Sequence, residues 1–115
     1  MDEYIPIYLT DVKIAIEELE SYFNDYPMRY DIFVKDFLRR SAVERKVEIM
    51  GEAINRILKI DKDFPLPNAR EIINTRNRII HGYDSVQPEF LWALVIRHIP
   101  IFKKDTIEAL QKFGL

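Results

Sequence analysis

Residues 8–27 read YLTDVKIAIEELESYFNDYP, and their apolar and aromatic side chains recur at intervals of four and three. The residues that share this spacing are Tyr8, Val12, Ala15, Leu19, Tyr22 and Tyr26. Such spacing places side chains on one face of an α-helix. Because Pro27 cannot continue a helix, we expect one long helix over about residues 7–26.

The central part of the chain continues the same spacing. Residues 30–38 predict a short helix, and the apolar positions from Val43 to Ile57 predict a second long one. The stretch 61–67 contains two prolines and should end that helix. Only three glycines occur in 115 residues, and no segment alternates apolar with polar side chains, so we expect no strand.

The last third of the chain predicts two further helices. Asn68 can cap a helix over about residues 69–81, with Glu71 in the capping-box position. Pro88 suits the first turn of a last helix, which Pro100 should kink or split. Together these elements predict an all-α fold, an antiparallel up-and-down bundle of about four principal helices plus a short extra helix.

The composition indicates one folded domain over residues 1–115, because 48% hydrophobic and 31% charged residues are typical of globular proteins. There is no cysteine and there are only two histidines, so we expect no disulfide, metal site or cofactor. No apolar run approaches the roughly 20 residues that span a bilayer. The start, Met1-Asp2-Glu3, is acidic, unlike a signal peptide. We therefore expect a cytoplasmic protein with no membrane contact.

The net charge of −2 is unevenly distributed along the chain. Residues 1–26 carry seven acidic side chains and one lysine, whereas residues 27–115 carry 12 acidic and 16 basic ones. An anionic partner would be attracted to the second part. Its positive excess is small for a non-specific binder of nucleic acid, so such a role requires a local site.

Residues 75–83 read TRNRIIHGY, and they depart from the amphipathic pattern. On a helix, Arg76 lies in the middle of the apolar stripe. A guanidinium there must pair with a buried acid, or the stripe must open into a cleft. Asn77 and His81 are four residues apart and share another face, where the amide could fix the imidazole tautomer.

Two interpretations of this stretch are open. A helix that ends in His-Gly is common, because a cation favours the C-terminal dipole and glycine supplies a left-handed cap. Alternatively, the two arginines, the asparagine, the histidine and the tyrosine within the eight residues 76–83 form an anion site. Such a site could bind a phosphodiester and transfer a proton near neutral pH.

Residues 76–83, RNRIIHGY, also resemble the R-N-x-x-x-H-x-Y signature of HEPN-domain proteins of the HepT type, the toxin partners of minimal nucleotidyltransferases. The resemblance extends over about residues 40–95, and Thr75 stands where many relatives have methionine. It implies a HEPN-like fold and a metal-independent endoribonuclease with an R-x4-H motif. It further implies a homodimer, an RNA substrate such as tRNA or mRNA, and a cognate nucleotidyltransferase antitoxin.

The resemblance also implies roles for the motif residues. The 2′-hydroxyl of RNA is the nucleophile in that family, so the protein supplies acid–base groups and a phosphate contact. His81 would transfer the proton and Arg76 would bind the phosphate. Asn77 would orient either the histidine or the RNA, and Arg78 is a further expected RNA contact. Tyr83 matches the tyrosine that the nucleotidyltransferase modifies with AMP, which silences the toxin.

Two alternatives follow from the same residues. The chain could be a non-catalytic helical nucleotide-binding or adaptor module for a nucleotidyltransferase. Tyr83 could be an interface or core residue.

The proposed site also has a geometric requirement. Arg76 and His81 point about 140° apart on an ideal helix, so a shared phosphate requires distortion near Gly82, the reach of the arginine, or motif residues from a second subunit.

Overall fold

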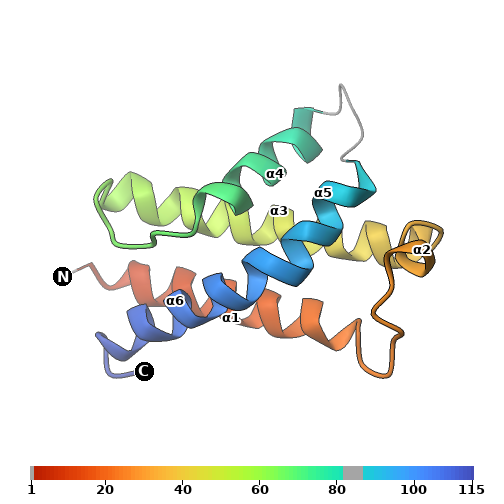
Figure 1. Cartoon of the computed structure of the whole chain (residues 1–115). Coiled ribbons are helices and arrows are strands. Elements are labelled where there is room, and N and C mark those ends of the chain that lie inside the picture. Colours follow the sequence, from red (N-terminus) through yellow and green to blue (C-terminus); the bar gives the residue numbers. More distant parts are fainter. Residues whose placement is uncertain (1, 82–86) are drawn as a thin grey trace.

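The structure of the protein, a computed structural model, describes residues 2–81 and 87–115. Every element in these two ranges is helical. The elements are α1 (Tyr4–Ser21), α2 (Tyr30–Phe33), α3 (Phe37–Ile60), α4 (Arg70–His81), α5 (Pro88–Ala93), the π-helix η1 (Leu94–His98) and α6 (Ile99–Gln111). Successive long helices run in opposite directions (Figure 1). The predicted all-α, up-and-down arrangement is confirmed.

The bundle is built around the pair formed by α1 and α3, which contact each other more extensively than any other described elements do. α3 also packs against α4, α1 packs against α6, and η1 contacts α4. The largest side chains buried between these helices are fully enclosed, among them Leu9, Ile16, Met50, Ile54 and Phe102. Truncating one such side chain to alanine typically costs about 2–5 kcal/mol of stability. This core fixes α4 beside α3.

The first helix is shifted from its predicted bounds of 7–26. α1 begins at Tyr4 and ends at Ser21, and residues 22–25 form turns. Asp25 adopts a φ of 57°, in the left-handed region that aspartate tolerates better than most residues. The chain therefore reverses before it reaches Pro27.

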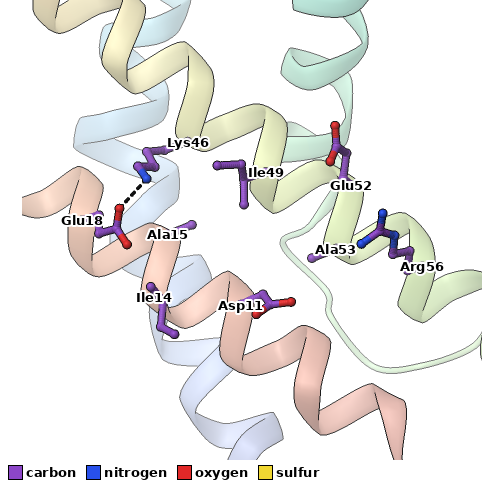
Figure 2. A pocket seen from close by; sticks show the side chains of 9 residues that line it. All are labelled: Asp11, Ile14, Ala15, Glu18, Lys46, Ile49, Glu52, Ala53 and Arg56. Atoms are coloured by element: carbon purple, nitrogen blue, oxygen red, sulfur yellow. Dashed lines mark hydrogen bonds and ion pairs between the residues drawn. The ribbon is translucent and has the colours of Figure 1, made fainter.

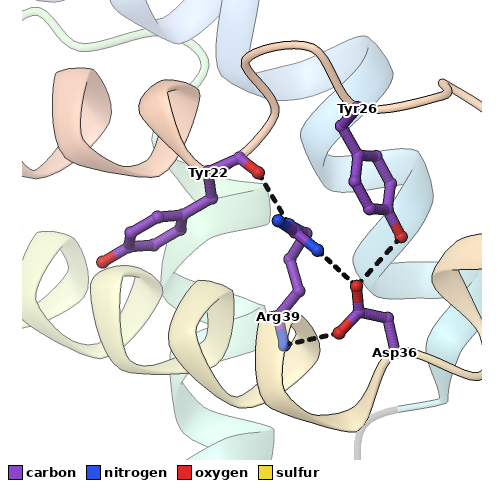
Figure 3. Close-up of polar contacts among 4 residues, drawn as sticks. All are labelled: Tyr22, Tyr26, Asp36 and Arg39. Atoms are coloured by element: carbon purple, nitrogen blue, oxygen red, sulfur yellow. Dashed lines mark hydrogen bonds and ion pairs between the residues drawn. The ribbon is translucent and has the colours of Figure 1, made fainter.

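A polar cluster at Asp36 divides the predicted 30–38 helix into α2 and the first turn of α3 (Figure 3). Asp36 caps α3, because its side chain accepts a hydrogen bond from the backbone N–H of Arg39 at 3.1 Å. Its carboxylate also pairs with the Arg39 guanidinium and accepts from the Tyr26 hydroxyl at 3.3 Å. Arg39 Nε donates to the carbonyl of Tyr22 at 2.6 Å, and its guanidinium lies 4.1 Å from the ring centroid of Tyr26. The cluster joins the start of α3 to the end of α1.

Pro100 lies in the first turn of α6, and the turn before it is the π-helix η1. The N–H of Ile99 donates to the carbonyl of Leu94, five residues earlier. This wider turn accommodates the proline, whose ring would clash with a carbonyl in a regular α-helix. The helix is therefore not split at Pro100 but changes to a π-helical turn just before it, and Pro88 begins α5 as expected.

The predicted N-cap of α4 is wrong. The helix begins at Arg70, so the residue before it is Ala69, whose carbonyl accepts from the N–H of Ile73 at 3.0 Å. Ala69 is buried against the core, and Asn68 is turned outward. The side-chain amide of Asn68 donates to Asp105 of α6 at 2.6 Å instead. A tertiary contact thus replaces the local cap.

None of the helices within residues 2–81 and 87–115 combines the length and the apolar character that a membrane-crossing helix needs.

Candidate functional site

The described part of the motif lies in the second half of α4. It comprises Arg76, Asn77, Arg78 and His81. Ile72 and Thr75 are the buried residues of this helix, and the Thr75 hydroxyl donates to the carbonyl of Glu71 at 2.8 Å. α4 remains helical as far as His81, its last residue. The motif therefore lies on a regular helix, and its first residue, Arg76, is on the side that packs against α3.

Arg76 lies against α3 at Gly51. A Cβ atom at Gly51 would lie 2.5 Å from Cγ and 2.6 Å from Cβ of Arg76, closer than side-chain carbons approach one another. Only glycine at this position lets the stem of the arginine cross α3. A glycine inside a helix costs roughly 0.5–1 kcal/mol relative to alanine, so the close contact explains its presence. The sequence prediction missed Gly51, although its place in the interior of a long helix was a usable signal.

The guanidinium of Arg76 has hydrogen-bond partners for only some of its N–H groups. Its Nε is buried and has no hydrogen-bond partner within the described residues. Its Nη1 is 3.4 Å from Oδ1 of Asn77, a long hydrogen bond. Within the two described ranges no carboxylate forms an ion pair with Arg76. The sequence left two options for this arginine, a buried acidic partner or a cleft that opens in the apolar face of the helix. The structure favours the cleft.

That opening is an open groove of about 600 Å³ between α3 and α4. The residues that line it are Glu52, Asn55, Arg56, Leu58, Lys59 and Arg76. Three of these side chains are cationic and one is anionic, so the groove attracts anions. The residues contributed by α3 were not among the predicted site residues.

A second groove lies between α1 and α3 (Figure 2). Its lining contains three acidic residues and two basic ones, and Lys46 crosses it to pair with Glu18. Glu52 and Arg56 line both grooves, from the same stretch of α3. Because its acidic side chains outnumber its basic ones, the second groove is the less suitable of the two for an anion.

The other predicted site residues are spread around the end of α4. Asn77 is half-buried beside Arg76. Arg78 is exposed, and its guanidinium lies 5.3 Å from the ring centroid of Phe90 in α5. His81 is exposed and is not among the described residues that line the Arg76 groove. The structure thus joins Arg76 to Asn77 but leaves His81 on another face of the helix.

The predicted site of AMP modification is not located, because Gly82 and Tyr83 lie outside the described ranges. In the ranges 2–81 and 87–115, no three or more histidine or acidic side chains are grouped so that they could hold a metal ion.

Comparison with known proteins relates nearly the whole chain to one family. The family model described as "Ribonuclease HepT-like" matches residues 12–109. The chain is 32% identical to the probable ribonuclease HepT of Thermococcus cleftensis, over 91% of this chain and 94% of that protein. It is 30% identical to a candidate RNase of Caldanaerobacter subterraneus subsp. tengcongensis, over 95% of this chain and 93% of the relative. A candidate RNase of Methanocaldococcus jannaschii is 28% identical, over 90% and 85% respectively. No solved structure gives a significant match to the chain.

Proposed function

Because the chain belongs to the HepT-like ribonuclease family, we propose that it is a metal-independent endoribonuclease that uses the 2′-hydroxyl of its RNA substrate as the nucleophile. The observation that carries this proposal is Arg76. Its stem is held against Gly51, and its buried Nε has no partner at the edge of a cationic groove. A phosphodiester oxygen would supply the missing acceptor, and a guanidinium can contact two phosphate oxygens at once.

The proposed reaction needs only proton transfer and charge stabilisation. A base takes the proton of the 2′-hydroxyl, and the 2′-oxygen attacks the adjacent phosphorus. The bond to the 5′-oxygen of the next nucleotide breaks, and an acid protonates that oxygen. His81 supplies one of the two proton transfers, and Arg76 stabilises the charge that develops on the phosphorane. The products are a 2′,3′-cyclic phosphate and a 5′-hydroxyl.

The site is assembled from two copies of the chain. α4 is helical from Arg76 to His81, so the two side chains leave the helix about 140° apart. A second subunit that brings its own α4 close would place its His81 opposite the first subunit's Arg76. Ile80 and Phe90, at this end of the molecule, are 46% and 52% exposed, and a homodimer would cover them.

The biological role that fits this enzyme is the toxin of a toxin–antitoxin pair, with tRNA or mRNA as the substrate. The antitoxin is a minimal nucleotidyltransferase that transfers AMP from ATP to Tyr83. In this step the phenol oxygen attacks the α-phosphorus of ATP, pyrophosphate leaves and the phenol proton is released. The adduct places a phosphodiester charge two residues from His81, where it repels the RNA phosphate.

The direct test is incubation of the purified protein with total RNA, with and without EDTA. We expect cleavage that survives EDTA and yields fragments that end in a 2′,3′-cyclic phosphate. Absence of cleavage, or cleavage that EDTA abolishes, would overturn the mechanism. A protein that binds a nucleotidyltransferase but leaves RNA intact would instead be an adaptor.

A further inference from the structure

We infer that the groove beside Arg76 is a subsite for the RNA backbone, in which Asn55, Arg56 and Lys59 of α3 bind phosphates that flank the one to be cleaved. This inference rests on the proposed ribonuclease function, and it extends the site from α4 to a second helix. Arg76 is where the two helices meet, because its stem lies against Gly51. A strand bound at Arg76 therefore passes directly over this part of α3.

The spacing of the α3 residues suits a strand. Glu52, Asn55, Arg56 and Lys59 follow one another at intervals of three, one and three residues, so they lie on one face of the helix. The distance along the axis from the first to the last is about 10 Å. A strip of this length can contact more than one phosphate of a single strand.

The cations of this groove remain available to a ligand. Within the described ranges, Arg56, Lys59 and Arg76 take part in no ion pair. The other cation that lines the two grooves, Lys46, differs from these three, since it is paired with Glu18 and largely shielded. Arg56 lies with its guanidinium 5.8 Å from the ring centroid of Tyr8, a contact that holds the side chain without neutralising it.

The lining of the groove favours a polyanion over a protein segment or a free nucleotide. Leu58 is its one apolar side chain, whereas pockets for small molecules are mostly apolar and more enclosed. Arg56 and Lys59 are exposed, so they can follow a flexible backbone. Glu52 is the exception, because its carboxylate repels phosphate and should weaken binding.

The test measures the affinity of the full-length protein for a single-stranded 2′-O-methyl RNA oligonucleotide by fluorescence anisotropy. The methyl group blocks the nucleophile, so binding is measured without cleavage. Arg56→Ala with Lys59→Ala should weaken binding about tenfold. The slope of the logarithm of the affinity against the logarithm of the salt concentration should also become shallower by about one or more. Glu52→Gln should tighten binding.

Two controls match these variants. Lys35→Ala removes one exposed lysine close to α2 and should bind as the wild type does. Arg56→Lys with Lys59→Arg keeps both charges and should restore most of the affinity. On natural RNA, the double alanine variant should raise KM by much more than it lowers kcat, which a general loss of folding would not produce.

The outcomes separate this inference from the proposed function. If the protein cleaves RNA but the double alanine variant binds and cleaves as the wild type does, the subsite is overturned and the ribonuclease stands. If no cleavage is seen but the anisotropy series behaves as expected, the ribonuclease fails and an RNA-binding groove stands. Complete competition by AMP alone, or no binding of the oligonucleotide, would overturn the subsite.

Discussion

The stem of Arg76 lies directly on Gly51, so that a Cβ atom on the glycine would be 2.5 Å from Cγ of the arginine. This contact fixes both the distance between α3 and α4 and the place where the guanidinium emerges. The arginine of the motif is therefore positioned by a residue 25 positions earlier in the chain.

Gly51→Ala should lower the rate of RNA cleavage at least tenfold. The new methyl group cannot fit beside Cβ and Cγ of Arg76, so α4 must move away from α3 or the arginine must leave the groove. Overpacking of this kind typically costs about 1–3 kcal/mol of stability as well. Cleavage kinetics and thermal unfolding should be measured on the same sample. Wild-type cleavage by a folded variant would show that Gly51 does not position Arg76.

Mixing two inactive variants should restore activity if the site is shared between subunits. In a dimer of one Arg76→Ala chain and one His81→Ala chain, one of the two shared sites keeps both residues. Co-refolded mixtures should therefore regain up to about a quarter of wild-type activity, because half of the dimers are mixed and each has one intact site. Each variant refolded alone is the control. No recovery, despite exchange of subunits shown by sedimentation or mass spectrometry, would place both residues in one subunit.

The sequence was a good guide to the long helices and a poor guide to contacts between them. The spacing of apolar residues identified α1 and α3, since burial of one face dominates their stability. It could not foresee that Ala69 is buried or that Asn68 bonds Asp105, because burial depends on the packed bundle and Asp105 lies on another helix, α6. The motif was enough to identify Arg76. By contrast, Gly51, Arg56 and Lys59 can be recognised as site residues only from the packing of α3 beside α4.

Asp36 should make the stability of the fold depend on acid pH. The backbone N–H of Arg39 bonds its carboxylate and is the main cause that holds the pKa of Asp36 below its ordinary value. The folded state therefore binds this proton more weakly than the unfolded state does, and the stabilisation is present above the ordinary aspartate pKa of about 4. It is lost as the pH falls through the lower pKa of the folded state.

We expect Asp36→Ala to reduce the free energy of unfolding by about 1 kcal/mol at pH 7, as the loss of an N-cap does. The difference from the wild type should shrink steadily in urea titrations below about pH 4. Asp31→Ala is the control, since Asp31 forms an exposed pair with Arg29 that contributes little. A difference that is independent of pH would rule out the carboxylate as its source.

Tyr83→Phe should give a ribonuclease that the nucleotidyltransferase cannot silence. The change removes one hydroxyl, the proposed acceptor of AMP, and should leave cleavage intact. Intact-mass spectrometry after incubation with the partner, ATP and magnesium should show one added AMP on the wild type and none on the variant. Tyr4→Phe, which alters an exposed tyrosine of α1, should be labelled like the wild type. Equal labelling of Tyr83→Phe would assign the modification to another residue.

The central claim is that Arg76 and His81 together cleave RNA, and the most direct measurement is the cleavage rate of one defined RNA by the wild type, Arg76→Ala and His81→Ala. We predict that each substitution lowers the rate by about 10²–10⁴-fold, as the loss of an acid–base or charge-stabilising group does, while helicity by circular dichroism is unchanged. A wild type that leaves the RNA intact, or variants that cleave it at the wild-type rate, would contradict the account.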